Sequence, residues 1–228
     1  MPARPPTDRY ALDDALPGRP LDPVPDGTNL LVVGDDASGA LEFVYRALAR
    51  APTYGEVVIL ATTDRTTAEL VAGYRSQLPD ADDLDHLYVV DASHSGLERE
   101  TGPLSPTRIE AASSPADVTG IGVGVTNHLR SVRSDRVRLG LCSLSAVVER
   151  LGPERAFAFA HVMTSRVRSA DHLGLFTVDP TRHEPEHVRV LQSLVDGTLT
   201  FRETDDGRRQ VRGAGVVAAI GEWTDVPN

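Results

Sequence analysis

The sequence predicts an α/β protein in which helices cover both faces of a parallel sheet and a β-hairpin lies near the C-terminus. Short apolar runs alternate with amphipathic helical patterns, in the order strand, helix, strand, helix, strand, which is typical of a parallel sheet covered by helices. The first run, residues 29–33, continues as Leu, Leu, Val and Val, as expected for a strand that is buried on both faces.

The further elements follow from the same two patterns. A helix is expected where apolar residues recur at helical spacing, as Leu41, Val44 and Leu48 do, and a strand where a short run is apolar throughout. The predicted strands are residues 29–33, 56–61, 87–91, 136–143 and 172–178. The predicted helices are residues 41–50, 68–78, 118–132, 145–169 with a potential break at Gly152 and Pro153, and 185–195.

Turn-forming residues mark the segments between these elements. Residues 92–114 are rich in Ser, Thr, Gly and Pro and are expected to form a long loop. Ser114 is the predicted N-cap of the helix that follows, with Pro115 in its first turn. The predicted hairpin pairs residues 198–202 with residues 208–212 around an Asp-Asp-Gly turn.

We divide the chain into a Pro-rich flexible tail, residues 1–27, and one domain, residues 28–228. The tail contains seven prolines among scattered charges, a composition typical of mobile segments. A helical turn over residues 10–16 that docks on the domain is the alternative. A chain of 228 residues is long enough to bury one sizeable core.

The composition is that of an acidic globular protein. The formal net charge is −10, and all 23 basic residues other than histidine are Arg. This balance indicates a salt-adapted, GC-rich organism such as a halophilic archaeon, with an acidic mesophile as the alternative, and it disfavours polyanions as partners. Because no apolar run reaches membrane-spanning length and the N-terminus lacks the apolar segment of a signal peptide, we expect a cytoplasmic protein without membrane contact.

A glycine frame follows the first strand. Gly34 and Gly39 enclose four residues between this strand and the next helix, which is the spacing of the phosphate-binding P-loop. The full P-loop continues with Lys and then Ser or Thr, whereas Ala40 and Leu41 stand here and the chain contains no lysine. Neither residue can contact the β- and γ-phosphates or hold Mg²⁺. The loop also carries two aspartates, and like charges about 4 Å apart repel by roughly 4 kcal/mol.

The order of segments from residue 28 to residue 213 resembles that of KaiC-like members of the RecA superfamily. Residues 136–146, Arg-Val-Arg-Leu-Gly-Leu-Cys-Ser-Leu-Ser-Ala, are similar to that family's second nucleotide motif, in which a strand ends in Asp-Ser-Leu-Ser. Residues 87–91 resemble its central strand, and residues 193–199 resemble its Ser-Leu-Ala-Asp-Gly-Val-Ile segment. The resemblance implies a RecA-like P-loop NTPase fold.

The same resemblance identifies positions at which the family's chemistry is missing. Cys142 matches the Asp that organises Mg²⁺, and a soft thiol does not replace a carboxylate toward this hard cation. Thr62, Thr63 and Asp64 match the region of the catalytic Glu-Glu pair, which leaves Asp64 as a candidate general base. The predicted degenerate nucleotide pocket consists of Gly34, Asp35, Asp36, Ala37, Ser38, Gly39, Ala40, Leu41, Thr63, Asp64, Cys142 and Ser143.

These replacements predict a pseudo-ATPase without catalytic residues, resident cofactor or metal. We expect it to act as a regulatory or scaffolding protein, through self-association or a protein partner. One alternative is an ATP-binding switch, or a weak ATPase in a hetero-oligomer, with ATP and Mg²⁺ as ligands. Another is a DNA-binding or recombination accessory protein in which Arg208, Arg209 and Arg212 contact nucleic acid, although ion pairs with surface aspartates are favoured for these arginines.

A zinc site is also disfavoured. The sequence His183-Glu-Pro-Glu-His187 matches the H-E-x-x-H pattern, which requires both histidines on one face of a continuous helix. Pro185 suits the first position of a helix, so His183 and Glu184 are expected to precede the helix as solvated residues.

Overall fold

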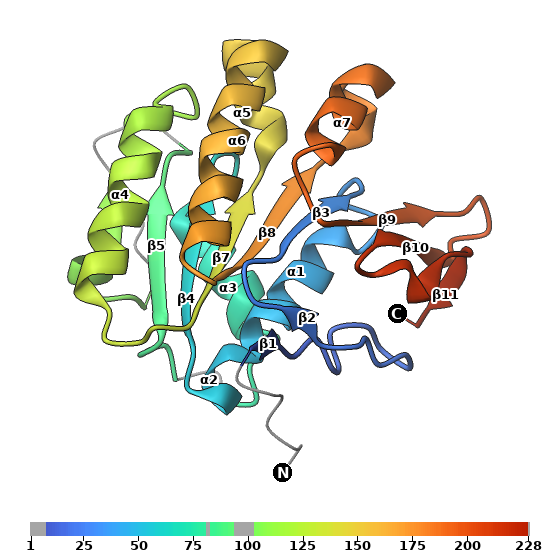
Figure 1. The fold of residues 1–228 in the computed structure, drawn as a ribbon, viewed down its shortest axis with the longest axis horizontal. Coiled ribbons are helices and arrows are strands. Elements are labelled where there is room, and N and C mark those ends of the chain that lie inside the picture. Colours follow the sequence, from blue (N-terminus) through green and yellow to red (C-terminus); the bar gives the residue numbers. More distant parts are fainter. Residues whose placement is uncertain (1–7, 81–82, 94–102, 228) are drawn as a thin grey trace.

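The computed structural model describes residues 8–80, 83–93 and 103–227 (Figure 1). The helices are α1 (Ala40–Ala49), α2 (Ala51–Tyr54), α3 (Thr67–Arg75), α4 (Val118–Ser131), α5 (Leu144–Leu151), α6 (Pro153–Ser169) and α7 (Pro185–Gln192). The strands are β1 (Arg9–Tyr10), β2 (Val24–Pro25), β3 (Asn29–Val33), β4 (Val57–Thr62), β5 (Leu87–Asp91), β6 (Ile109–Ala111), β7 (Val137–Cys142), β8 (Leu173–Val178), β9 (Gly197–Glu203), β10 (Arg209–Gly215) and β11 (Thr224–Val226). Within the described ranges, none of these helices is both long and apolar enough to cross a bilayer.

The main sheet has nine strands in the order β11-β10-β9-β3-β8-β7-β4-β5-β6. All neighbouring pairs from β9 to β6 are parallel, whereas β10 and β11 are added antiparallel at the other edge. The predicted hairpin is formed by β9 and β10, with Arg209 opposite Glu203. The predicted fold class, a parallel α/β sheet with a C-terminal hairpin, is therefore confirmed.

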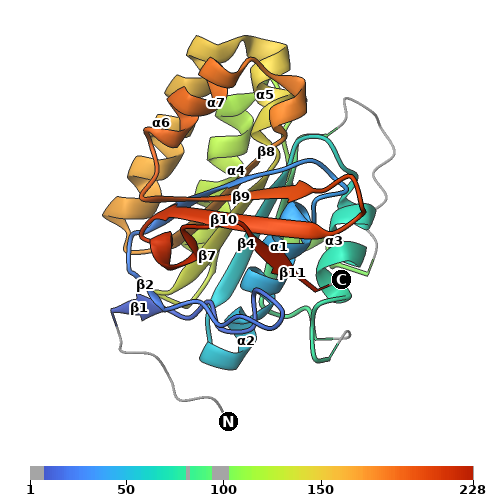
Figure 2. The same cartoon turned by 90° about the vertical axis from the view of Figure 1, so that its right-hand side faces the viewer.

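Helices cover both faces of the sheet, as Figure 2 shows from the side. Helices α1 and α3 supply buried residues to one apolar core, and α4 to α7 supply them to the other. Side chains alternate across a strand, so Leu30 and Val32 of β3 enter the first core while Leu31 and Val33 enter the second. The predicted break lies between α5 and α6, at Gly152.

The N-terminal segment differs from the expected mobile tail. Residues 8–27 pack along the sheet, where β1 pairs antiparallel with β2. Tyr10, Leu12 and Leu16 are buried in the core that also contains α1. Burying apolar side chains of this size stabilises a segment by about 1.5–3 kcal/mol each, which offsets the disordering tendency of the prolines. Residues 1–7 of the predicted tail lie outside the described residues.

Two local predictions also need correction. Part of the expected long loop, residues 109–111, forms β6 and pairs with β5, while residues 94–102 of that loop lie outside the described ranges. Helix α4 is capped by Asp117, whose carboxylate accepts the backbone N–H of Gly120 at 2.8 Å, and not by Ser114. Aspartate is as good an N-cap as serine, so the pattern of cap residues alone did not determine where the helix begins.

A buried ion network connects the sheet to the N-terminal segment. Arg138 in β7 is fully buried and donates to the Glu56 carboxylate. Arg136 donates to the other oxygen of Glu56 at 3.1 Å and pairs with Asp26, also at 3.1 Å. The Arg136 guanidinium lies 4.1 Å from the centroid of the Tyr10 ring. Glu56 therefore pairs with both guanidinium groups, and Asp26 adds a second carboxylate at the point where the N-terminal segment docks.

We expect Glu56→Gln to lower the free energy of unfolding by about 3–5 kcal/mol, because Arg138 loses its buried counter-charge. Urea denaturation followed by circular dichroism measures this change. The matched control is Glu203→Gln in the exposed end of β9, which should change stability by less than about 0.5 kcal/mol. Equal effects of the two substitutions would contradict a structural role for the network.

Candidate functional site

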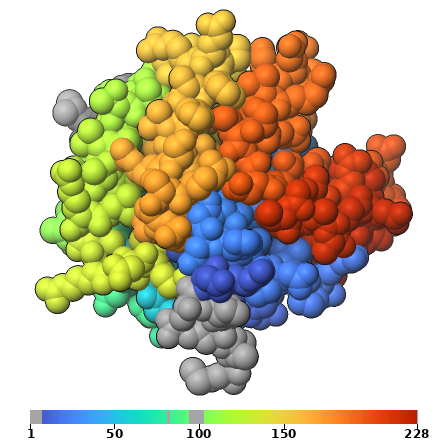
Figure 3. Space-filling view, viewed as in Figure 1, coloured from blue at the N-terminus to red at the C-terminus, as the bar shows by residue number. Residues whose placement is uncertain are grey.

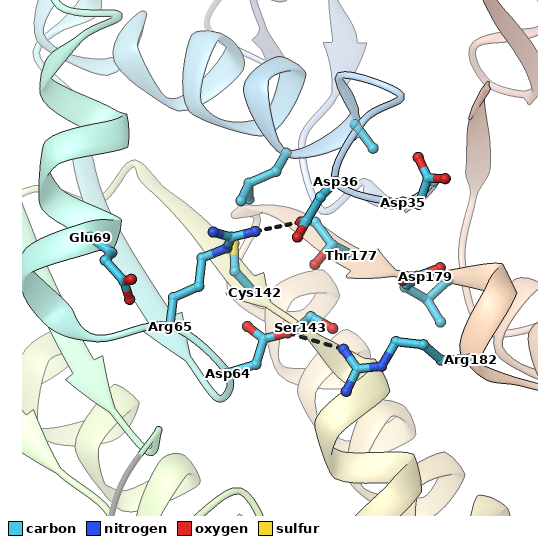
Figure 4. A pocket seen from close by; sticks show the side chains of 14 residues that line it. Asp35, Asp36, Asp64, Arg65, Glu69, Cys142, Ser143, Thr177, Asp179 and Arg182 are labelled. Atoms are coloured by element: carbon cyan, nitrogen blue, oxygen red, sulfur yellow. Dashed lines mark hydrogen bonds and ion pairs between the residues drawn. The ribbon is translucent and has the colours of Figure 1, made fainter. Parts of the chain in front are cut away.

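A cleft of about 370 Å³ opens at the carboxyl ends of β3, β4, β7 and β8 (Figure 4). This edge of an open α/β sheet is where ligands commonly bind. The lining comes from the loop and helix start after β3, the segment between β4 and α3, the end of β7, and the segment that follows β8.

The loop between β3 and α1 is held by its own side chains. The Asp35 carboxylate accepts the Ser38 backbone N–H at 2.9 Å, and the Ser38 hydroxyl donates to the Asp35 carbonyl at 2.7 Å. Gly39 has a φ of 85°, which glycine adopts without steric cost. A Cβ on Gly34 would lie 2.4 Å from the Ser38 hydroxyl oxygen, so the compact loop requires glycine there. Asp35 thus satisfies one of the loop's own N–H groups.

Strand β10 fixes this loop from outside the cleft. The Nε of Arg209 donates to the carbonyl of Ala37 at 3.0 Å, and another nitrogen of the same guanidinium donates to Glu42 at 2.9 Å. Glu42 also accepts from Arg46, one helical turn further along α1. These contacts join the loop, α1 and the C-terminal hairpin.

Two arginine–carboxylate pairs connect the segments that line the cleft, as the dashed lines in Figure 4 show. Arg65 pairs with Asp36 of the loop after β3. Arg182 lies 3.5 Å from Asp64 and also donates to both oxygens of Glu149, at 2.6 and 2.8 Å. The segments that follow β3, β4 and β8 are therefore tied together by charge.

Asp64 is a carboxyl group of the cleft whose pKa is raised by the protein. Burial raises the pKa of Asp64 above its usual range, while Arg65 and Arg182 offset part of that rise. Hydrogen bonds from Arg182 hold the pKa of the Glu149 carboxyl below its usual range. A half-buried carboxyl with a raised pKa in a cleft is a pattern that is common at functional sites.

The floor of the cleft is uncharged. Cys142 is buried, and this burial raises the pKa of its thiol to about 12. The Thr63 hydroxyl donates to the Ser143 carbonyl at 2.5 Å and accepts the Ser143 backbone N–H at 2.8 Å. The thiol is thus protonated at neutral pH, and Thr63 joins the ends of β4 and β7.

The structure brings most of the predicted pocket residues to the cleft, but not all of them. Those that line it are Gly34, Asp35, Asp36, Ala40, Leu41, Asp64, Cys142 and Ser143. Ala37, Ser38, Gly39 and Thr63 are not among the lining residues. Ser38 and Thr63 are buried behind the surface, and Arg209 packs on Gly39 and on the Ala37 carbonyl.

Sequence reasoning missed six of the fourteen lining residues, five of them polar. The additional residues are Arg65, Glu69, Thr177, Val178, Asp179 and Arg182. All but Glu69, which lies in the predicted helix 68–78, are in predicted strands or within a few residues after them, and the carboxyl ends of parallel strands meet at one end of a sheet. This rule could have identified these residues from the sequence. It predicts that they lie at the carboxyl ends of the strands, but it does not predict which arginine pairs with which carboxylate.

The cleft is acidic overall. Among its described lining residues, the five carboxylates of Asp35, Asp36, Asp64, Glu69 and Asp179 outnumber the two arginines. Glu69 accepts the backbone N–H of Thr66 at 2.8 Å as part of the cap of α3. This excess of negative charge disfavours a polyanionic ligand in the cleft and favours a neutral or cationic one.

Two other sequence motifs lie outside the cleft. Pro185 is the first residue of α7 and Glu184 its N-cap, so His183 precedes the helix as predicted. Arg208 forms ion pairs with Asp206 at 2.8 Å and with Asp225 at 3.1 Å. No sequence motif pointed to Trp223, whose ring centroid lies 3.9 Å from the Arg202 guanidinium and 4.9 Å from that of Arg212.

Comparison with known proteins identifies the family. A model described as a family of unknown function, DUF7504, matches residues 27–201. The chain belongs to this family. No curated protein matches this DUF7504 chain. Its structure is similar to that of a KaiC-like protein from the hyperthermophilic archaeon Pyrococcus horikoshii OT3, with a TM-score of 0.64 and 14% identity over 96% of this chain and 93% of the other. The RecA-like fold that the sequence resemblance implied is thus confirmed.

We expect Asp64→Asn to raise the unfolding midpoint at pH 7. A folded-state pKa above the unfolded value of about 3.9 means that the protonated form stabilises the fold below that pH, and that this contribution is lost as pH rises through the folded-state pKa. At pH 7 the ionised carboxylate therefore costs stability, while Arg182 retains Glu149 as a partner. Thermal denaturation at pH 7 and near pH 3.5 measures the difference, which should shrink at the lower pH.

The control is Asp206→Asn in the exposed hairpin turn. Hydrogen bonds from Thr204 and Arg208 lower the pKa of Asp206, so this substitution should leave the midpoint unchanged or reduce it at pH 7. A neutral or destabilising effect of Asp64→Asn at pH 7 would contradict this prediction, because it would show that the ion pair with Arg182 outweighs the desolvation of the Asp64 carboxylate.

Proposed function

We propose that this DUF7504 chain is a non-hydrolysing RecA/KaiC-like domain that acts as a regulatory or scaffolding protein through protein–protein association. The proposal rests on the composition of one cleft. The positions that would bind phosphate carry apolar side chains, and the position that would bind a metal carries a neutral thiol. The candidate general base is already paired with an arginine of the protein.

The phosphate-binding side of the cleft supports this proposal. Ala40 and Leu41 begin α1 and line the cleft, and neither can provide the ammonium or hydroxyl group that holds phosphate and Mg²⁺ in P-loop enzymes. Arg65, a lining cation, is paired with Asp36. A triphosphate would have to break this pair and approach the Asp35 carboxylate, which costs binding energy on both counts.

The metal and general-base positions support it as well. The Cys142 thiol, with its pKa raised to about 12, is neutral and soft, whereas Mg²⁺ requires hard oxygen ligands. The Thr63 hydroxyl is used by the Ser143 backbone. Asp64, the remaining candidate base, faces Arg182 at 3.5 Å. Although burial raises the pKa of Asp64, its carboxylate is engaged by this arginine within the protein.

The outer surface of the helices offers a different activity, which is the binding of another protein. Exposed large apolar residues occur on three helices of one face, as Val123 in α4, Val162 in α6 and Val190 in α7. Exposed apolar residues that gather on one face are typical of protein interaction sites. This distribution supports association with a protein partner.

The deciding experiment is a titration of the purified chain with ATP and MgCl₂, followed by isothermal calorimetry and by melting temperature. We expect neither saturable heat nor a shift in melting temperature. A ligand present at a hundredfold its Kd would stabilise the folded state by about 2.7 kcal/mol, which is a readily measured shift. Titration with MgCl₂ alone is the control for a non-specific ion effect.

Two outcomes would contradict the proposal. Saturable ATP binding that Arg182→Ala abolishes, and that the matched variant Arg208→Ala outside the cleft retains, would establish a nucleotide-binding switch. Mg²⁺-dependent ATP hydrolysis that Asp64→Asn abolishes would establish an active ATPase.

A further inference from the structure

The outer surface of helices α4, α6 and α7 has an unusual concentration of exposed apolar residues. In the described chain, three of the four large apolar residues classed as exposed lie there: Val123 at 52%, Val162 at 55% and Val190 at 41%. The fourth, Val216, is 46% exposed and follows β10 elsewhere on the molecule. Figure 3 shows this face, with α4 on the left, α6 in the middle and α7 on the right. We call it the α4–α6–α7 face.

A basic groove runs along one side of α6. It has a volume of about 520 Å³, lies between α4 and α6, and is lined by Val123 and Val162 together with Arg155 and Arg166. Arg166 spans the two helices, because it donates to the Gly122 carbonyl at 3.0 Å. Among the described residues that line this groove there is no Asp or Glu, which is notable on a chain with a net charge of −10.

An acidic groove runs along the other side of α6. It has a volume of about 480 Å³ and is lined by Phe157 and Val190 together with Glu154 and Glu186. No Arg occurs among its described lining residues. The two grooves therefore combine apolar floors with opposite charges, and α6 separates them.

Their spacing is set by helical geometry. Glu154 and Arg155 are adjacent in the first turn of α6, so their side chains point about 100° apart and each enters a different groove. Glu186 lies in the first turn of α7, beside Glu154 in the same groove. Glu154, Arg155 and Glu186 thus stand at a similar level along α6, whereas Arg166 lies eleven residues further along the helix than Arg155.

A second copy of this chain carries the matching pattern. A two-fold axis parallel to α6 would exchange the two sides of α6 while keeping each residue at its level along the helix, so the basic groove of one copy would cover the acidic groove of the other. Arg155 would then meet Glu154 and Glu186 of the second copy. Such self-complementarity is what an isologous interface requires, with an apolar centre and charged groups around it.

We propose that the α4–α6–α7 face joins two copies of the chain in a two-fold dimer, with α6 of each copy against α6 of the other and the basic groove of each copy facing the acidic groove of its partner. This proposal rests on the proposed function, because it identifies the partner in protein–protein association as the chain itself. Two molecules of net charge −10 repel each other at long range, so local complementarity of this kind is needed for their association.

Analytical ultracentrifugation of the full chain at about 0.15 M and about 1 M salt tests the proposal, because salt at the higher concentration screens net charge within a few ångströms. We expect a concentration-dependent monomer–dimer equilibrium. Val162→Asp and Val123→Asp should each raise the dimer Kd by about tenfold or more, equivalent to about 1.4 kcal/mol. The matched control Val216→Asp should leave the Kd unchanged. All three positions are exposed, and circular dichroism verifies that each variant is folded.

A charge exchange tests the orientation of the two copies. Arg155→Glu should weaken the dimer at about 0.15 M salt, and adding Glu186→Arg in the same chain should recover part of the affinity, because the exchanged charges attract again. A chain that stays monomeric, or a dimer that tolerates both Val→Asp substitutions, would overturn the proposal. A dimer that Arg155→Glu weakens and Glu186→Arg does not rescue would overturn the two-fold arrangement.

These results are distinguishable from a failure of the proposed function. The nucleotide titration reports on the cleft at the carboxyl ends of the strands, which shares no lining residue with either groove. An ATPase that dimerises would refute the pseudo-ATPase role alone, and a monomer that ignores ATP would refute the dimer alone.

Discussion

The assembly of this sheet depends most on the buried ion pair between Glu56 and Arg138. Arg138 is fully buried in β7, and burying a guanidinium without a counter-charge costs several kcal/mol. Glu56, just before β4, supplies that charge and also accepts from Arg136. Arg136 in turn pairs with Asp26 and packs on Tyr10. The need to neutralise one buried arginine therefore connects two central strands to the N-terminal segment and explains why a Pro-rich sequence is held in place.

At the carboxyl ends of the central strands, the ion pairs are weaker and more exposed to solvent. There, Arg65 pairs with Asp36 and Arg182 with Asp64, at positions that remain partly open to solvent. Exposed pairs of this kind contribute little to stability, and burial raises the pKa of Asp64 in spite of them. The cleft thus keeps an energetically unfavourable charge, whereas each guanidinium of the ion network at the amino end of the sheet has a carboxylate beside it. A site in which carboxylates outnumber arginines disfavours polyanions.

The likeness to a KaiC-like protein extends over nearly the whole chain at 14% identity, which illustrates how little sequence identity a shared fold requires. The fold needs only apolar side chains at the right period, and many sequences meet that requirement. A reaction needs particular groups at a few positions. Different residues at a few positions, such as 40, 41 and 142, can therefore change what a cleft binds while the strands and helices stay intact.

The sequence by itself determined the parallel strands, the helices between them, the C-terminal hairpin and most of the cleft lining, because periodic burial and the meeting of strand ends are local or topological properties. It did not determine the position of the N-terminal segment or the strand at residues 109–111, since the burial of the first and the pairing of the second with β5 depend on surfaces that exist only after folding. Nor did it indicate that Arg65 and Arg182 would face Asp36 and Asp64. Ion pairs between residues far apart in the chain depend on distances of a few ångströms, and only the packed tertiary structure decides these.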